Sequence, residues 1–243
     1  MIICSIFLKS GGIIMKRIIE EIEESVRIHG HDGQQGLGMW LDYLVDMFDV
    51  KYIVNGTYDK HLEDKAKEDE HLFNATILWL EIVSKGIESS GWIDVFGNIY
   101  EEMYQSKGKS SMLGQFFTPE GLCTIMEKIN GGISGKTGDP ACGSGRTLLA
   151  AYTENKSGYY VGEDIDGISC KMCALNLMVH GARGRVICHD TIASPVYFNW
   201  GYEINEVRYP IPTPFYSLRL ISNVRTDEEI VKIESNVEQL KLS

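Results

Sequence analysis

Residues 139–145 read Asp-Pro-Ala-Cys-Gly-Ser-Gly and connect a strand-like segment that begins at residue 137 to a helix-like segment that begins at residue 146. Glycines at such a turn let the backbone approach a ligand closely, because a Cβ atom there would occupy the ligand's space. The first turn of the following helix also presents N–H groups without intrahelical partners. The stretch therefore predicts a ligand-binding turn at the start of an α/β unit.

Strand-like and helix-like segments alternate from this turn onward. A helix is predicted over 120–129, after Thr118-Pro119, where threonine can cap the helix and proline suits its first position. Downstream we expect strands over 137–141, 159–163 and 185–188, separated by helices over 146–152 and 169–180. This alternation is typical of βαβ units and predicts an α/β fold with a parallel sheet and helices on both faces.

The first hundred residues have a helical pattern instead. Apolar residues recur at helical spacing in 13–28, 37–47, 72–87 and 91–104. The charged run 60–71 is interpreted as a solvated loop or helix face. Met1 to Met15 is either a short edge strand or translation from an upstream start, with Met15 as the alternative initiator. We expect a mainly helical region over 1–110 and a ligand-binding α/β domain over 111–243.

The composition is that of a soluble globular protein, with 44% hydrophobic and 23% charged residues among 243. No stretch approaches the roughly 20 apolar residues that a membrane-spanning helix needs, so we expect no membrane association. Six cysteines are scattered through the chain, which favours a reduced cytoplasm. Cys170 and Cys173 form a CxxC pair in a helix-like segment without a second pair at zinc spacing, so both are interpreted as structural and no metal is expected.

The net charge of −11 is unfavourable for a protein that binds DNA without a partner, because lysine and arginine contacts to phosphates supply most of the non-specific affinity for DNA. The charge is uneven, however. Between Arg183 and Arg225, five arginines face three acidic residues, which gives this segment a net charge of +2. It is the best candidate for a nucleic-acid face, and we expect DNA to be reached through a partner subunit.

The spacing around residues 139–145 separates three classes of ligand. A dinucleotide site requires G-x-G-x-x-G, but the third glycine is missing here and Asp139 would face a pyrophosphate. Gly135-Lys136-Thr137 resembles the end of a phosphate-binding loop, but Asn130 stands where the first glycine is required. A carboxylate at the start of the turn suits a cationic ligand, and the ammonium group of S-adenosylmethionine is one that it can pair with.

Acidic residues also follow the second and third predicted strands. The second strand ends in Glu163 and Asp164, and a carboxylate there can accept hydrogen bonds from both hydroxyls of a ribose. We assign this role to Asp164, while Asp166 is the best candidate to cap the next helix. Asp190 follows the third strand, where its carboxylate could accept a hydrogen bond from the amino group of an adenine. Together these residues favour a cationic nucleoside ligand such as S-adenosylmethionine.

At these residues the chain resembles the type I modification-subunit branch of the adenine-N6 DNA methyltransferases. The likeness covers roughly residues 90–195, and the segment from Asp94 to Glu102 looks like the one that leads into the family's core. The matching blocks, which occur in the family's order, are Gly114-Gln-Phe-Phe-Thr-Pro, Asp139-Pro-Ala-Cys-Gly-Ser-Gly, Gly162-Glu-Asp-Ile-Asp, Asn176-Leu-Met-Val-His-Gly and His189-Asp-Thr-Ile. The resemblance implies a Rossmann-like S-adenosylmethionine-dependent methyltransferase sheet.

The resemblance also implies which residues hold the cofactor. It places the methionine carboxylate at Thr118, the ribose at Asp164 and the adenine at Asp190. Thr118 comes from the resemblance alone, whereas the turn and the two acids follow from the residues as well. The other residues implied to contact the cofactor are Asp139, Pro140, Ala141, Gly143, Ser144, Gly145 and Ile165.

One family feature is missing. Members carry Asn or Asp, then Pro, Pro and an aromatic residue; the first two positions accept hydrogen bonds from the adenine amine, and the aromatic ring stacks on the flipped base. The nearest candidates here are Ser194-Pro-Val-Tyr197, which comes too early, and Thr213-Pro-Phe215, which lacks the amide or carboxylate. The catalytic residues are therefore unassigned, and we expect a sheet that is truncated or reworked on its C-terminal side, followed by a helix over 224–242.

Two hypotheses of function remain. The first is an S-adenosylmethionine-dependent DNA adenine-N6 methyltransferase of a restriction-modification system, working with a specificity subunit or as a homo-oligomer. The second is a catalytically inactive homologue that binds the cofactor and acts as a regulatory or structural subunit. The matching blocks favour the first, and the missing block favours the second.

Overall fold

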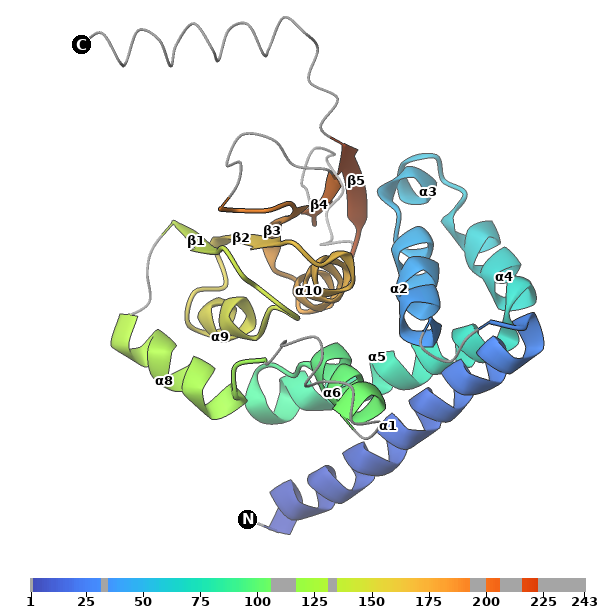
Figure 1. Ribbon diagram of the computed structural model, residues 1–243, viewed down its shortest axis with the longest axis horizontal. Helices are drawn as coiled ribbons and strands as arrows, with labels where there is room; N and C mark the ends of the chain where they lie inside the picture. Colours follow the sequence, from blue (N-terminus) through green and yellow to red (C-terminus); the bar gives the residue numbers. More distant parts are fainter. Residues whose placement is uncertain are drawn as a thin grey trace, which may run out of the picture.

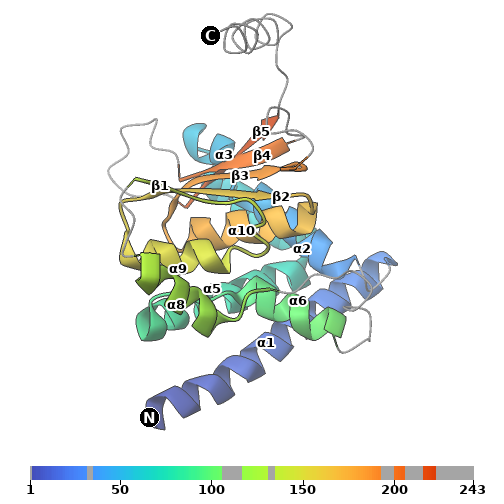
Figure 2. The ribbon, with the colours of Figure 1, turned by 60° about the vertical axis from the view of Figure 1, so that its left-hand side comes forward.

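The computed structural model describes residues 2–31, 35–105, 117–130, 135–192, 200–205 and 216–222. The described chain forms three layers, with a sheet on one side, two helices beneath it, and a lower layer of helices from the first part of the chain (Figures 1 and 2). In chain order the elements are α1 (Ile2–His29), α2 (Gly36–Met47), α3 (Val50–Val54), α4 (Tyr58–Glu68), α5 (Glu70–Ser90), α6 (Val95–Gln105), α8 (Glu120–Asn130), β1 (Lys136–Asp139), α9 (Arg146–Glu154), β2 (Tyr159–Asp164), α10 (Gly167–Val179), β3 (Arg183–Cys188), β4 (Trp200–Ile204) and β5 (Leu218–Ser222).

The helices predicted in the first hundred residues are present as α1, α2, α5 and α6. The edge strand proposed for Met1 to Met15 is wrong, because the chain is helical from Ile2 onward. A short apolar run does not by itself distinguish a strand from a helix. Here the run continues a helix whose later turns bury Ile18 and Ile22 completely, so packing further along the same helix decides its conformation.

The charged run 60–71 is a helix face for the most part, since α4 covers residues 58–68. It is not wholly solvated. His61 and Lys65 are buried, and the Lys65 ammonium lies 3.2 Å from the Asp46 carboxylate and 2.9 Å from that of Glu68. Two partners on one cation make its burial tolerable. The mixed charges of residues 60–71 therefore did not indicate that one of the lysines, Lys65, faces inward.

The sheet has the order β1-β2-β3-β4-β5, in which β1, β2 and β3 are parallel while β4 and β5 run antiparallel to their neighbours. The predicted alternation of strands and helices is confirmed from β1 to β3, with boundaries that differ by at most two residues. The chain thus has the expected α/β, Rossmann-like fold with a helical N-terminal region. Its C-terminal side is reworked, because β4 lies beside β3 as an antiparallel strand.

The expectation of helices on both faces of the sheet is wrong for the described residues. Both crossover helices, α9 and α10, lie on one face and contact each other (Figure 2). Successive strands advance in one direction, from β1 to β2 to β3, and right-handed crossovers that advance in one direction place their helices on the same face. Helices on the second face would require a connection that returns toward β1.

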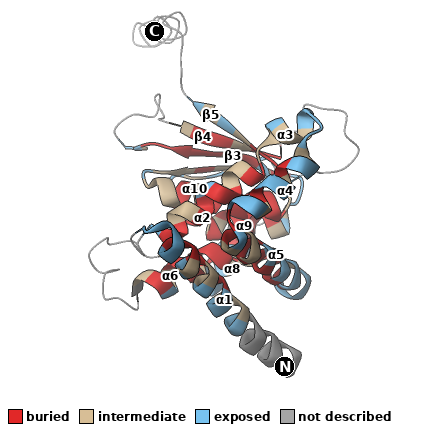
Figure 3. Ribbon diagram, turned by 90° about the vertical axis from the view of Figure 1, so that its right-hand side faces the viewer, coloured by how far each residue is buried: buried red, intermediate tan, exposed pale blue. Residues whose placement is uncertain are grey.

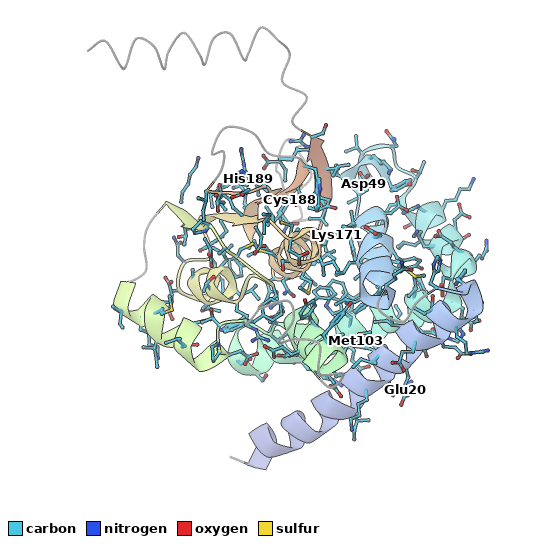
Figure 4. The ribbon with its side chains drawn as sticks, viewed as in Figure 1. Glu20, Asp49, Met103, Lys171, Cys188 and His189 are labelled. Carbon is cyan, nitrogen blue, oxygen red and sulfur yellow. The ribbon has the colours of Figure 1, made fainter. Side chains whose placement is uncertain are left out.

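A continuous hydrophobic core joins the helical region to the α/β part (Figure 3). Its centre is aromatic: the Phe96 ring lies 5.3 Å from that of Trp40 and 5.0 Å from that of Trp79, and all three side chains are fully buried. The helix α10 is buried on nearly all sides because it packs against the sheet above and against α2 and α6 below. At the edge of this contact Lys171 of α10 pairs with Asp42 of α2, and Figure 4 shows Lys171 between the two helices.

In the part of the chain that the structure describes, none of the helices combines the length and the apolar character needed to cross a bilayer. Residues 106–116, the candidate blocks at 194–197 and 213–215, and the helix expected over 224–242 lie outside the described residues.

Replacing the central ring, Phe96→Ala, should lower the free energy of unfolding by about 3–5 kcal/mol, because it removes a fully buried ring and leaves a cavity between α6 and the tryptophans. Urea unfolding followed by circular dichroism measures the change. The matched control is Ile129→Ala on α8, where the side chain is 78% exposed and the change should stay within about 0.5 kcal/mol. Equal effects of the two substitutions would contradict this description of the core.

His180 makes stability depend on pH. Its Nε2 accepts a hydrogen bond from the Ile93 N–H (3.1 Å) and its Nδ1 donates to the Asn176 carbonyl (2.7 Å), an arrangement that requires the neutral ring. Burial lowers the pKa of His180 to about 4, below its unfolded value of 6.5. The neutral ring's contribution is therefore complete at neutral pH and is lost as the pH falls from the unfolded pKa toward the folded one.

Between pH 7 and pH 5 this residue should cost the protein about 2 kcal/mol of unfolding free energy. Urea midpoints at the two pH values, measured for the unsubstituted protein and for His180→Gln, isolate the effect, because all other titrating groups are shared. The variant should lose correspondingly less stability on acidification. Identical pH dependence in the two proteins would mean that His180 becomes protonated in the folded state without penalty.

Candidate functional site

The three parallel strands end at one edge of the sheet, and their following loops are joined there. The Cys142 N–H donates to the Glu163 carbonyl (2.9 Å), and the His189 N–H donates to the Asp164 carbonyl (2.9 Å). The Thr191 hydroxyl donates to the Pro140 carbonyl (3.2 Å). Figure 4 shows Cys188 and His189 at this end of β3. Ligands of open parallel sheets bind outside such an edge, so these loops form the candidate site.

The first loop, residues 140–145, requires its two glycines. Gly143 and Gly145 have φ angles of 53° and 92°, in the left-handed region that glycine adopts at little cost. A Cβ atom on Gly143 would lie 2.9 Å from the Phe117 ring, and one on Gly145 would lie 2.8 Å from the Cys173 sulfur. The sequence argument assigned this space to a ligand, but protein side chains fill it. The glycines therefore let the loop pack tightly between Phe117 and α10.

Asp139 ends β1 and turns its carboxylate into the first loop. One oxygen accepts a hydrogen bond from the Ala141 N–H (3.0 Å), and the other accepts one from the Thr147 hydroxyl at the start of α9. These contacts fix the carboxylate beside the glycines. Because a carboxylate offers about four acceptor positions, Asp139 keeps capacity for a ligand.

Asp164 links the second strand to the first loop. Its Oδ2 accepts from the Gly143 N–H (2.9 Å), and its Oδ1 accepts from the Asp166 N–H (2.9 Å). The predicted role of Asp166 as a helix cap is confirmed, since its Oδ2 accepts from both the amide and the hydroxyl of Ser169. The half-buried carboxylate of Asp164 therefore lies between the first two loops, where it can reach a ligand that spans them.

The remaining predicted residues of the second and third loops face solvent. Ile165 is 70% exposed after β2, and Asp190 is exposed after β3 with one oxygen accepting from the Ile192 N–H (3.0 Å). Both lie at the same edge of the sheet as Asp139 and Asp164. Carboxylates from all three strands therefore gather along this edge, which is suited to a cationic or hydroxyl-rich ligand.

A small cavity of about 40 Å³ opens beside the first loop. It brings together Thr118, which the resemblance alone had assigned, and the independently predicted Asp139. The cavity can hold only one end of a ligand, because whole small-molecule sites occupy about 300 Å³ or more. Its lining residues are Phe117, Thr118, Asp139, Ala141, Cys142, Gly143, Ser144, Arg146 and Thr147.

The thiols around the first loop are buried. A hydrogen bond with Cys173 and burial raise the pKa of Cys142 well above its usual value, and burial raises the pKa of Cys170 as well. Thiols held neutral in this way are poor nucleophiles and poor metal ligands. Cys142, Cys170 and Cys173 therefore act as small packing residues between the loop, β2 and α10.

Sequence reasoning missed several residues of the site, and two of them, Arg146 and Thr191, connect distant segments. Arg146 is buried at the start of α9 and lines the cavity, while Thr191 ties the third loop to the first. Arginine and threonine at these positions are ordinary choices for a helix start and a loop. Their roles depend on partners that are more than 40 residues away in the sequence, which no local pattern reveals.

Comparison with known proteins shows what this chain is similar to. The model of the N-6 DNA Methylase family matches residues 91–235. The EcoEI type I restriction enzyme methylase subunit of Escherichia coli is 25% identical over 156 residues, which are 56% of this chain and 32% of the relative. The MjaIX methylase subunit of Methanocaldococcus jannaschii is 31% identical over 110 residues, 40% of this chain and 19% of the relative. The HindI methylase subunit of Haemophilus influenzae is 28% identical over 99 residues, 36% of this chain and 22% of the relative.

Among solved structures, the methyltransferase subunit of a type I restriction-modification system from Streptococcus thermophilus aligns over 78% of this chain and 56% of its own, with 13% identity and a TM-score of 0.36. The chain spans a third or less of the length of the three methylase subunits that it matches. The family match covers more than half of the chain and includes every loop of the candidate site. The chain therefore belongs to the N-6 DNA methylase family, as its sequence blocks had indicated.

Proposed function

We propose that this chain binds S-adenosylmethionine at the carboxyl edge of β1, β2 and β3 and serves in the methylation of adenine N6 in DNA. The observation that carries the proposal is the bond from the Gly143 N–H to the Asp164 carboxylate, which joins the glycine loop to the acid of the second strand. That bond supports the proposal because it holds the Asp164 carboxylate, which we assign to the ribose, beside the turn that we assign to the amino-acid end of the same ligand. Membership of the family supports the same cofactor and substrate.

The proposed orientation follows from the charges and the space. The methionine end enters the cavity beside Thr118 and Asp139, where the Asp139 carboxylate pairs with its ammonium group. The ribose lies against Asp164 and Ile165, and the adenine lies toward Asp190. The backbone of Pro140, Ala141, Gly143, Ser144 and Gly145 supplies the wall between them.

When bound, S-adenosylmethionine supplies an electrophilic methyl group on its sulfonium sulfur. The residues of this chain fix both ends of the cofactor, so that the methyl group faces one direction outside the sheet edge. A target adenine has to be flipped from the duplex to reach such a position. The acidic chain is unsuited to holding DNA alone, so a partner subunit or a second copy contributes to DNA binding in this proposal.

A second candidate function is favoured by one observation. The 243 residues contain no Asn or Asp followed by Pro, Pro and an aromatic residue. Without acceptors for its amine, adenine lacks the hydrogen bonds that prepare N6 for attack. The alternative is therefore a cofactor-binding subunit without transfer activity of its own, which regulates or supports a catalytic partner.

The proposed location is the cytoplasm. The five cysteines whose side chains are described, Cys123, Cys142, Cys170, Cys173 and Cys188, are all free thiols. Buried thiols without disulfides are typical of reducing compartments.

Calorimetric titration of the purified chain with S-adenosylmethionine tests the binding step. The unsubstituted protein should bind, and Asp164→Ala should weaken the affinity by about tenfold or more, because the variant loses both the ribose acceptor and the bond that holds the glycine loop. The matched control is Asp59→Ala on the exposed face of α4, which should leave the affinity unchanged. Absence of binding to the unsubstituted chain would contradict the proposed function.

Transfer of a labelled methyl group to unmethylated DNA distinguishes the two candidates. If the chain is a complete enzyme, label appears on adenine N6 and disappears with Asp164→Ala. If it is a binding subunit, cofactor binds but the DNA stays unlabelled. Label on adenine N6 would show that other residues of this chain replace the missing block.

A further inference from the structure

Asp94, at the start of α6, accepts hydrogen bonds from four groups, which lie in the three helices α6, α9 and α10 and in the glycine loop. It is fully buried, and its Oδ1 accepts from the Gly97 N–H (2.8 Å) and the Asn176 side-chain amide (2.7 Å). Its Oδ2 accepts from the Ser144 hydroxyl (2.5 Å) and the Arg146 Nε (2.7 Å). All the acceptor positions of this carboxylate are therefore filled, and two of its partners belong to the glycine loop or the helix start that follows it.

Arg146 extends this connection to the segment that precedes α8. Its guanidinium donates to Glu101 (3.1 Å) and to the Asn98 side chain (2.9 Å), both on α6. It also donates to the Thr118 carbonyl at 3.5 Å and lies 5.3 Å from the centre of the Phe117 ring. One buried cation thus connects α6, the glycine loop and the Phe117-Thr118 segment.

The packing around Asp94 leaves no space for a side chain at position 97. A Cβ atom on Gly97 would lie 2.0 Å from the Asp94 Oδ2 and 2.8 Å from the Ser144 hydroxyl oxygen. The Asn176 amide, which bonds Asp94, also donates to the Ser144 carbonyl (2.9 Å). In the sequence, Asp94, Gly97 and Glu101 belong only to the segment that leads into the family's core. The structure gives a reason for their spacing, because Asp94 and Gly97 lie against Ser144 of the glycine loop and Glu101 binds Arg146.

The Arg146 guanidinium keeps its positive charge although it is buried. Burial opposes ionisation of Arg146, but the carboxylates of Asp94 and Glu101 more than compensate and raise its pKa. A buried ion pair adds little net stability, yet removing one partner leaves an uncompensated charge that forces its surroundings to rearrange. Here the surroundings include Ser144 and Thr118, which line the small cavity.

The network reaches only one end of the candidate site. Ser144, Arg146 and Thr118 line the cavity at the proposed methionine end. At the proposed nucleoside end, the Asp164 carboxylate accepts from the Gly143 and Asp166 N–H groups, and neither bond includes Asp94 or Arg146. A change in Asp94 should therefore affect the two ends of the ligand unequally.

We propose that Asp94 and Arg146 form a positioning device through which the helical region sets the methionine end of the cofactor pocket. The inference rests on the proposed function, since it takes S-adenosylmethionine as the ligand. Neither residue is assigned a contact with the reacting atoms. Asp94 acts through Ser144 and Arg146, and Arg146 acts through Thr118 and Phe117.

The test compares two ligands on Asp94→Asn. S-adenosylmethionine carries the amino-acid end, whereas 5′-methylthioadenosine has the same adenosine without it. The variant should bind S-adenosylmethionine about tenfold more weakly, because an amide has one acceptor oxygen, and its NH2 group would face either Ser144 and Arg146 or the donors of Gly97 and Asn176. Its affinity for 5′-methylthioadenosine should stay within about twofold of that of the unsubstituted protein. Calorimetry gives both constants, and thermal unfolding records the loss of stability.

The matched control is Asp69→Asn. Asp69 is also buried at the start of a helix, where it accepts from the Leu72 N–H (2.9 Å) and the Ser25 hydroxyl (2.6 Å), but its partners lie in α1 and α5. This variant should lose stability without changing the affinity for either ligand. Comparing it with Asp94→Asn separates positioning from general destabilisation.

A second variant covers the case in which Asp94→Asn does not fold. Glu101→Gln removes the charge of the other carboxylate bound to Arg146, and the Glu101 side chain is 31% exposed, so the substitution is milder. It should reduce the affinity for S-adenosylmethionine about threefold and leave the affinity for 5′-methylthioadenosine unchanged. An equal loss for both ligands, or no loss for either, overturns the positioning role. If the unsubstituted protein binds neither ligand, the proposed function fails instead.

Discussion

The parallel pairing of β1, β2 and β3 is the constraint on which the candidate site depends. Parallel strands connected by right-handed crossovers must end at the same edge, so Asp139, Asp164 and Asp190 arrive together although they lie far apart in the sequence. The crossovers also place α9 and α10 on one face, where α10 becomes the centre of the molecule. The edge is then completed by short bonds between loops, of which the one from Gly143 to Asp164 is the most direct.

The helical region is joined to this edge by charge as well as by packing. Phe96, Trp40 and Trp79 fix α6 against the rest of the core, and Asp94 at the start of the same helix reaches the glycine loop. A rigid aromatic centre therefore holds the carboxylate that organises the loop. The family match begins at residue 91 and therefore includes α6, which contacts Arg146 although it precedes the first strand by more than 30 residues.

The order of strands and helices and the acids at the strand ends could be predicted, because periodicity and turn composition are local signals. Asp166 was identified as a cap for the same reason. The one-sided coverage of the sheet, the antiparallel β4 and the network of Asp94 and Arg146 depend on contacts between distant segments, which a single sequence does not display. Gly143 and Gly145 show both cases. The need for glycine at these positions could be predicted from the turn, but the atoms that a Cβ would meet, those of Phe117 and Cys173, could not.

Hydrogen exchange of the chain with and without S-adenosylmethionine tests the central claim most directly. Binding at the carboxyl edge should slow exchange in residues 139–145, 163–166 and 188–192 together, since one ligand would cover all three loops. A larger cavity of about 470 Å³ lies in the described helical region, lined in part by Asp46 and Lys65, and it should show no change. Protection around that cavity, without protection of the three loops, would contradict the assignment of the site.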